Sequence, residues 1–266
     1  MVDTPWGPLP VGLVYGFVGF LGLSLGSFAN VLIYRLPREE SLVTPPSRCP
    51  GCGRRIKPWE NIPVLSYLIL GGKCAGCKAR ISIRYPLVEL ACGVLAVGAV
   101  HVFGVSYAGF AHGLLFVALL SLILIDLEHW LLPFAITIPM AVVGLVGALF
   151  FDLRGVGDAL LGMLVGGGIF LIMLVGGKYL FKKDAMGGGD VVFGIMAGSF
   201  LGWKLILLMV FLASLLGTLL ALPLLVAGKD LTGKMIPFGP FLAVAMVVCI
   251  FFGDPIVHWY THLILR

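Results

Sequence analysis

Two aspartates stand at the edges of long apolar runs, where a charge is costly. Asp126 closes the run 114–125, and Asp190 follows three glycines and opens another apolar stretch. A carboxylate in such a place needs a functional reason, and glycines let a backbone turn sharply or approach a substrate closely. Two carboxylates a few ångströms apart share a proton. One then accepts a proton from water while the other donates one to a carbonyl oxygen or a leaving nitrogen. The pair predicts peptide hydrolysis without a metal or a covalent intermediate.

Simpler interpretations of the same residues stay open at this point. Glu128, His129 and Trp130 are typical of a membrane–water interface. Asp126 would alternatively cap a helix or pair with a loop lysine, and Asp190 would be the N-cap of the helix that it opens. None of these interpretations accounts for the glycines before Asp190, which are Gly187, Gly188 and Gly189.

Four cysteines form two pairs with metal-ligand spacing. Cys49 and Cys52 flank Pro-Gly, Cys74 and Cys77 flank Ala-Gly, and 21 residues separate the pairs. Two such pairs complete a tetrahedral site, and zinc is the ion expected for four thiolates. The alternative of two disulfides is disfavoured in a reducing cytoplasm, where the topology below puts this segment. With four protein ligands the site is structural, and a segment of about 50 residues needs such a staple.

The composition is that of a membrane protein. Of the 266 residues, 60% are hydrophobic and 12% are charged, and a soluble fold of this size cannot bury so much apolar surface. Continuous runs of about 20 residues favour membrane helices over the alternating strands of a barrel. We therefore predict an all-α polytopic membrane protein with about eight transmembrane helices. The expected spans are 10–33, 86–103, 108–126, 134–151, 157–181, 190–203, 204–227 and 236–252, the sixth being short for a full crossing.

These spans predict four parts. The first transmembrane helix belongs to 1–33. The long polar segment 34–85 is a small cytoplasmic zinc-ribbon-like module between helices 1 and 2. A transmembrane core with both acids covers 86–254. The tail 255–266 mixes His, Trp and Tyr with apolar residues and is expected to lie at the membrane interface.

Lysine and arginine predict the orientation. Ten of the eighteen lie between Arg35 and Arg84, and the positive-inside rule then puts this segment in the cytoplasm and the N-terminus outside. Asp126 and Asp190 fall at the cytoplasmic face on this topology. Lipid and topology explain the net charge of +5, so no nucleic-acid partner is needed. The other basic residues in loops predicted to be cytoplasmic are Lys178, Lys182, Lys183, Lys229 and Lys234.

Several short motifs follow one another along most of the chain. Their order is Ser27 to Val31, Tyr34 to Pro37, the two cysteine pairs, Asn61 to Pro63, Arg84 to Glu89, Ile125 to Leu127 with Leu132-Pro133, Gly187 to Asp190, and Ile236 to Phe241. This ordered set resembles the type IV prepilin peptidases, which are bacterial inner-membrane aspartic proteases with a Gly-x-Gly-Asp motif.

The resemblance implies an activity, cofactors and partners. Members of the family cleave the basic leader from prepilins and type II secretion pseudopilins at the cytoplasmic membrane face. Many then methylate the new N-terminal amine with S-adenosylmethionine. By resemblance, Asp126 and Asp190 are the hydrolytic pair and the four cysteines bind structural zinc. Asn30, Arg35 and Glu89 either bind substrate or support the zinc module. Two positions depart from the family pattern. Phe134 stands where the family usually has Asp, and Val192 stands where it usually has Lys.

Two other classes of protein are competing interpretations. A proton-coupled transporter also uses paired acids, but it distributes ionisable residues through the bilayer depth, whereas here they cluster at one face. An assembly subunit without activity would follow if the two departures had disabled catalysis. The remaining conspicuous residues, Cys92, Cys249 and Gly166 to Gly168, are expected to serve helix packing.

Overall fold

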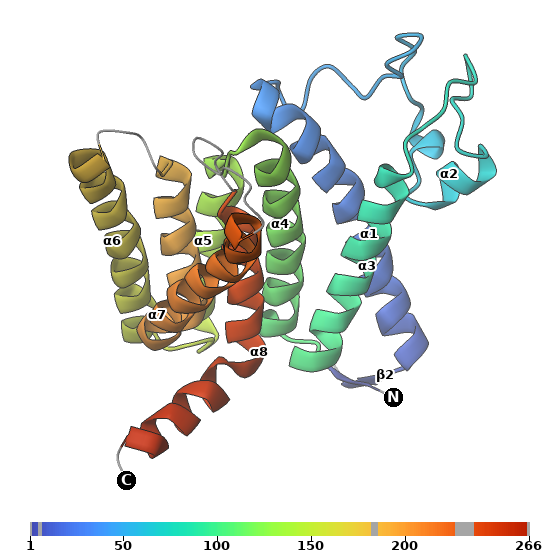
Figure 1. Ribbon diagram of the computed structural model, residues 1–266. Coiled ribbons are helices and arrows are strands. Elements are labelled where there is room, and N and C mark those ends of the chain that lie inside the picture. Colours follow the sequence, from blue (N-terminus) through green and yellow to red (C-terminus); the bar gives the residue numbers. More distant parts are fainter. Residues whose placement is uncertain (1, 5–6, 182–185, 227–236, 265–266) are drawn as a thin grey trace. The chain divides into compact units, whose positions relative to one another are not determined.

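The computed structural model describes residues 2–4, 7–181, 186–226 and 237–264 (Figure 1). Contacts divide the chain into two units, Met1–Ser121 and Leu122–Arg266. The long elements of the described ranges are all helices, as the apolar runs predict. They are α1 (Val11–Arg35), α3 (Arg84–Phe103), α4 (Tyr107–His129), α5 (Phe134–Phe150), α6 (Val156–Phe181), α7 (Gly188–Val226) and α8 (Gly239–Ile264).

Six of the described helices are long and apolar enough to cross a membrane, and α5, with 17 residues, is a shorter apolar helix. The 39 residues of α7 are two helices joined at Gly202, whose φ of 73° and ψ of 176° are not helical. When both halves of α7 and α5 are counted, the described chain has the eight apolar segments expected. The break falls beside the predicted boundary between the spans 190–203 and 204–227. The prediction of an all-α polytopic protein is confirmed.

In the first unit, α1 and α3 pack closely along small residues. A Cβ on Gly22 would lie 2.7 Å from the Ala96 methyl group, and one on Gly26 would lie 2.6 Å from the Glu89 Cα. Cys92 is fully buried between them, as expected of a packing residue. A two-stranded antiparallel hairpin, β1 (Val2–Thr4) and β2 (Gly7–Leu9), precedes α1 and was not predicted.

The segment between α1 and α3 contains little regular structure. Its elements are the 3-10 helices η1 (Leu36–Arg38) and η2 (Pro58–Glu60) and the short helix α2 (Leu65–Ile69). Two isolated antiparallel bridges, Arg48 to Arg55 and Lys73 to Arg80, close the two cysteine turns. Such a segment has no large apolar core, so other interactions must hold it together.

In the second unit, α6 and α7 approach through facing glycines. Gly162 packs against Gly198, and Gly166 packs against Gly194, so closely that a Cβ at any of these positions would clash. Small residues allow this backbone contact between membrane helices. The packing role expected of Gly166 is therefore confirmed, whereas Gly168 faces open space. Figure 1 shows the α6 to α8 region with α8 extending beyond it as a bent helix, which contains Pro255.

Candidate active site and metal centre

Asp126 lies in the last turn of α4 and is buried. The helix stops at the next residue after His129, Trp130, which has a φ of 58°. The Trp130 N–H donates to the Asp126 carbonyl oxygen over 3.0 Å. A positive φ ends a helix and turns the chain. The turn leads through Leu132 to Pro133, which precedes the first residue of α5. The segment after Asp126 thereby passes back beside the acid.

The Asp126 carboxylate caps the start of α8. Gly239, the first residue of α8, donates its main-chain N–H to Asp126 Oδ2 over 2.8 Å. Helix N-termini carry unpaired N–H groups and attract anions, and the next residue, Pro240, has no N–H to satisfy. A Cβ on Gly239 would lie 2.6 Å from Asp126 Oδ2. The bond between Gly239 and Asp126 therefore needs glycine at position 239. Asp126 does cap a helix, as one of the simpler interpretations proposed, but the helix is α8, whose first residue lies 113 positions later in the chain.

Asp190 is the third residue of α7 and not its N-cap. Its Oδ2 accepts the Gly187 N–H over 3.2 Å, and its own N–H donates to the Gly187 carbonyl oxygen over 3.2 Å. A carboxylate that reaches back over the first turn in this way stabilises a helix start. Gly189 lies so close to Leu132 that a Cβ there would be 2.7 Å from the Leu132 carbonyl oxygen. This close approach explains one of the three glycines.

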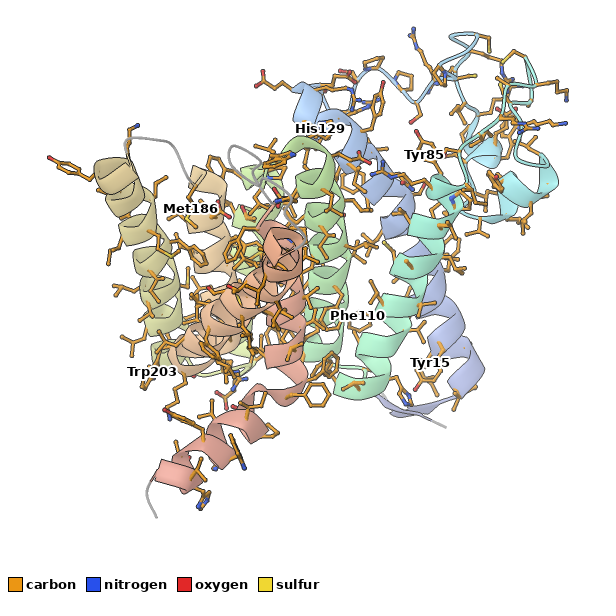
Figure 2. The ribbon with its side chains drawn as sticks, viewed as in Figure 1. Tyr15, Tyr85, Phe110, His129, Met186 and Trp203 are labelled. Atoms are coloured by element: carbon orange, nitrogen blue, oxygen red, sulfur yellow. The ribbon has the colours of Figure 1, made fainter. Side chains whose placement is uncertain are left out.

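Leu132 brings the two acids together. It contacts Gly189, beside Asp190, and its Cδ2 would lie 3.0 Å from a Cβ on Gly239, which binds Asp126. Each acid binds a main-chain N–H through Oδ2, and a carboxylate has a second oxygen for other partners. Figure 2 shows His129 and Met186 at the same end of the second unit, with Trp203 at the opposite end.

Phe134, one of the two departures from the family pattern, lies against the glycine turn. Its Cζ is 3.7 Å from the position of a Cβ on Gly188, and half of its surface is exposed. An aromatic ring thus replaces a charge directly beside the turn that carries Asp190. Val192, the other departure, is partly buried in the first turns of α7.

Sequence reasoning missed two residues of this site, Leu132 and Gly239. Both belong to motifs that carry the resemblance, yet neither has a reactive side chain. The available signal was the run Pro237-Phe238-Gly239-Pro240 at the start of an apolar stretch. Glycine before proline at a helix start is compatible with a ligand that binds the first free N–H.

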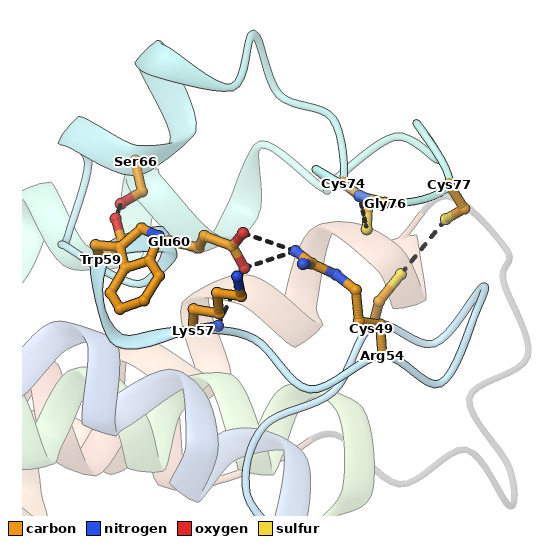
Figure 3. Close-up of polar contacts among 9 residues, drawn as sticks. All are labelled: Cys49, Arg54, Lys57, Trp59, Glu60, Ser66, Cys74, Gly76 and Cys77. Carbon is orange, nitrogen blue, oxygen red and sulfur yellow. Dashed lines mark hydrogen bonds and ion pairs between the residues drawn. The ribbon is translucent and has the colours of Figure 1, made fainter.

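The two cysteine pairs converge as predicted by their spacing. The four Sγ atoms lie within 4.8 Å of one another, and Cys49 Sγ is 3.8 Å from Cys77 Sγ (Figure 3). Zinc–sulfur bonds of about 2.3 Å in a tetrahedron place the sulfurs about 3.8 Å apart. All six cysteines are free thiols. The donor set and its dimensions therefore fit a zinc ion and do not fit the alternative of two disulfides.

The two cysteine turns have equivalent main-chain bonds. The Cys49 N–H donates to the Arg54 carbonyl oxygen over 2.9 Å, and the Cys74 N–H donates to the Ala79 carbonyl oxygen over 2.9 Å. The Gly76 N–H points at Cys74 Sγ over 3.4 Å. Hydrogen bonds from the N–H groups of Cys77 and Gly76 lower the pKa of Cys74 to about 6. The turn thus favours a thiolate, which is the form that binds metal.

Arg54 connects the cysteine turns to the rest of the module. Its Nη2 donates to both oxygens of Glu60, over 2.7 and 2.6 Å (Figure 3). The Lys57 N–H also donates to Glu60 Oε2, over 3.0 Å. The hydrogen bond from Arg54, and to a smaller extent that from the Lys57 N–H, holds the pKa of Glu60 below its usual value. The pair fixes η2 beside the first cysteine turn.

Three polar residues of the first unit bind main-chain groups of the segment between α1 and α3 or of the first turn of α3. Arg35 donates to the carbonyl oxygens of Ser41 and Pro45, over 2.6 and 2.7 Å. Asn30 donates to the Tyr85 carbonyl oxygen over 3.1 Å, and Glu89 Oε2 accepts the Val64 N–H over 2.8 Å. These contacts favour the supporting role over substrate binding for Asn30, Arg35 and Glu89.

Two family models match the chain. Residues 20–103 match the Bacterial Peptidase A24 N-terminal domain, and residues 113–222 match the Type IV leader peptidase family. The prepilin leader peptidase/N-methyltransferase of Pseudomonas aeruginosa is 39% identical over an alignment of 267 positions, gaps included. The alignment covers 90% of this chain and 91% of that protein. The protein of the same name from Stutzerimonas stutzeri is 40% identical, and the match covers 90% of this chain and 91% of that protein. The one from Aeromonas hydrophila is 36% identical, and the match covers 96% of this chain and 94% of that protein. No solved structure matches the chain.

The apolar helices and the two family matches define a multi-pass membrane peptidase. More narrowly, the chain belongs to the type IV leader peptidase family, because relatives of up to 40% identity match nearly all of its length.

Proposed function

We propose that this enzyme removes the leader from prepilins or pseudopilins and then methylates the new N-terminal amine. The names of the relatives support the two activities. The observation that supports the peptidase activity is the position of Leu132, which lies against both Gly189, beside Asp190, and Gly239, which binds Asp126.

The acid pair supplies the chemistry of hydrolysis. Two neighbouring carboxylates share one proton. The ionised acid takes a proton from water, which attacks the scissile carbonyl carbon. The protonated acid donates first to the carbonyl oxygen and, on collapse of the tetrahedral intermediate, a proton reaches the leaving nitrogen. The N–H groups of Gly187 and Gly239 hold the two carboxylates in place during these transfers.

Two cofactors belong to the proposal. S-adenosylmethionine supplies the methyl group, in keeping with the relatives' name. Zinc is held by Cys49, Cys52, Cys74 and Cys77, whose sulfur positions fit it. Its role is structural, because four protein ligands complete its coordination.

The proposed topology has the N-terminus outside and the acids at the cytoplasmic face of the bacterial inner membrane. The ten basic residues between Arg35 and Arg84 support it. Lys178, in the last turn of α6, supports it in the same way, while Lys182, Lys183, Lys229 and Lys234 lie outside the described residues. On this topology 34–85 is a cytoplasmic module, 86–254 is the membrane core, and 255–266 lies at the opposite interface. An epitope inserted after Val43 should be digested by protease in inside-out vesicles and protected in right-side-out vesicles; the reverse pattern would overturn the orientation.

The peptidase proposal is tested with purified protein in detergent and a prepilin. Wild type should shorten the prepilin on a gel, whereas Asp126→Asn and Asp190→Asn should not. Asp254→Asn is the matched control, since Asp254 is an exposed acid that pairs with Arg154 over 3.3 Å. Cleavage that survives in both Asn variants would overturn the acid pair.

The methyltransferase is tested separately with pilin that has already been cleaved. Wild type and Asp190→Asn should both add the mass of one methyl group when S-adenosylmethionine is present. A wild-type enzyme that cleaves without adding this mass would contradict the second activity only.

A further inference from the structure

The segment around α2 has an unusual surface for a polar module. Its exposed large apolar side chains are Trp59, Ile62, Leu65, Leu68 and Ile69, which we call the apolar patch; Leu68 and Ile69 are 67% and 74% exposed. The polar Ser66, in contrast, is buried and donates to the Trp59 carbonyl oxygen over 2.9 Å (Figure 3). It also accepts the Ile62 N–H over 2.9 Å. This is the reverse of the arrangement that water favours.

The depth of α2 follows from its bond to α3. Glu89 Oε2 accepts the Val64 N–H, directly before α2, over 2.8 Å. Glu89 is five residues inside α3, and five residues of helix rise about 7 Å. The same level on α1 is Gly26, which packs on the Glu89 Cα. Figure 1 agrees, because it shows α2 beside the first turns of α3.

The membrane surface is marked on these helices by aromatic and basic residues. Tyr34 and Arg35 lie at the end of α1, and Arg84 and Tyr85 begin α3 (Figure 2 labels Tyr85). Tyrosine and arginine gather at headgroup level. Along α3, the Glu89 Cα lies about 6 Å below Tyr85. Val64 is bonded to the end of the Glu89 side chain, which points back toward the start of α3, so it lies between that level and the headgroups. Interfacial helices bury their apolar face about 5 to 10 Å below the headgroups.

The backbone at Val64 is strained. Its φ is 61° and its ψ is −49°, and the flanking Leu65 N–H donates to the Pro63 carbonyl oxygen over 2.6 Å. This is the rare γ-turn, which is unfavourable for a β-branched residue. The buried Glu89 carboxylate compensates for the strain by accepting the Val64 N–H. The chain is thus bent to bring α2 to this depth.

Charge supports a lipid as the occupant of the patch. No charged residue occurs from Asn61 to Gly72, and the exposed Lys57 and Lys73 flank this stretch. Lys57 Nζ lies 5.2 Å from the centre of the Trp59 ring. An apolar centre with an aromatic residue and lysines at its edges matches an anionic bilayer surface.

We propose that the apolar patch inserts into the headgroup and upper acyl-chain region of the bilayer. The module is then anchored to the membrane by α2 as well as by α1 and α3. Arg54 and Glu60 connect the first cysteine turn to η2 and hence to Trp59. The inference does not depend on the proposed peptidase activity.

The test uses the full-length protein in vesicles of phosphatidylcholine and phosphatidylglycerol. Leu68→Trp adds an indole to the patch, and Val43→Trp is the matched control, because Val43 is 84% exposed in the loop after α1. The fluorescence of the added tryptophan is the difference between each variant and wild type. Its quenching is measured with lipids brominated in the upper acyl chain and, separately, with acrylamide in the water. Bromolipid should quench Leu68→Trp and leave Val43→Trp bright, while acrylamide should do the opposite.

Equal quenching of the two variants by acrylamide, with no effect of bromolipid, would overturn the proposal. Shielding of Leu68→Trp that occurs only after a prepilin is added would also overturn it, in favour of a protein-docking surface. The native Trp59 gives a second measurement that does not depend on the Leu68 variant. The fluorescence that bromolipid quenches should be smaller in Trp59→Phe than in wild type, and an unchanged amount would overturn the proposal.

Discussion

Gly239 donates its main-chain N–H to the Asp126 carboxylate over 2.8 Å, and no room exists for a side chain between them. The first turn of α8 thereby fixes one acid of the pair. Leu132 touches both Gly239 and Gly189, so the position of α8 and the position of Asp190 depend on the same residue. A motif without any reactive side chain thus determines the geometry of the acids.

Gly239→Ala is expected to reduce prepilin cleavage strongly. The methyl group would lie 2.6 Å from Asp126 Oδ2, so the carboxylate or α8 must move. A displacement of about 1 Å at a catalytic group costs on the order of 100-fold in rate. Single-turnover cleavage measures the effect. Gly168→Ala is the control, because a Cβ there meets nothing within 4 Å, and equal rates for the two variants would refute the positioning role of Gly239.

Removal of zinc should loosen the segment between α1 and α3. A chelator, or Cys49→Ser, is expected to abolish the content of about one zinc per chain and to expose residues 39–57 to protease. Metal analysis and limited proteolysis in detergent check this. Cys92→Ala removes a buried thiol outside the cluster and should keep its zinc; a full zinc content in Cys49→Ser would contradict the four-cysteine site.

The ion pair of Glu60 predicts a dependence on acid. Arg54 and the Lys57 N–H hold the pKa of Glu60 below its usual value. Its stabilising effect is therefore present above the unfolded pKa of about 4.3 and is lost as pH falls through the lower folded pKa. At pH 7, Glu60→Gln should make the segment more sensitive to protease than wild type, and the difference should shrink below about pH 4. Glu39→Gln, at an exposed position, is the control. A difference that persists unchanged in acid would exclude the ion pair as its cause.

The break in α7 is stabilised by Asp158. Its Oδ1 accepts the Trp203 N–H over 3.2 Å, and Gly202 has a φ of 73°. Loss of such a cap costs about 1 kcal/mol. A non-glycine residue with the φ and ψ of Gly202 costs about 1 to 3 kcal/mol, and a Cβ there would clash with the Asp158 carboxylate. Asp158→Ala and Gly202→Ala are both expected to lower the melting temperature in detergent. Gly157→Ala, where space is open, should not; a break that tolerates alanine equally well would contradict this account.

The fold and the identity of the acids could be predicted from local pattern. Apolar runs specify membrane helices, and Asp126 and Asp190 interrupt them at ends that the alternating topology puts on one side. The cysteine spacing likewise predicts a cluster that the sulfur positions fit. These features depend on residues within a few turns of one another.

The contacts that position the site depend on residues far apart in the chain. Gly239 reaches Asp126 across 113 residues, and no periodicity in the sequence encodes that pairing. The depth of α2 depends on one bond between Val64 and Glu89. Five apolar residues are too few to predict a membrane segment, so 34–85 was predicted only as a polar module. Asp190 was correctly placed at the start of a helix, but its role within the first turn depends on the backbone at Gly187.

The first half of α7 is also shorter than a bilayer is thick. From Gly188 to Leu201 it has 14 residues, about 21 Å of helix, against a hydrocarbon thickness of about 30 Å. If Trp203 marks one lipid surface, Asp190 lies about 20 Å above it, below the level that the opposite surface would have in an unperturbed bilayer. A short helix is accommodated by local thinning. We expect water to reach the acids through such a dip, and longer acyl chains should then oppose the dip and slow the enzyme.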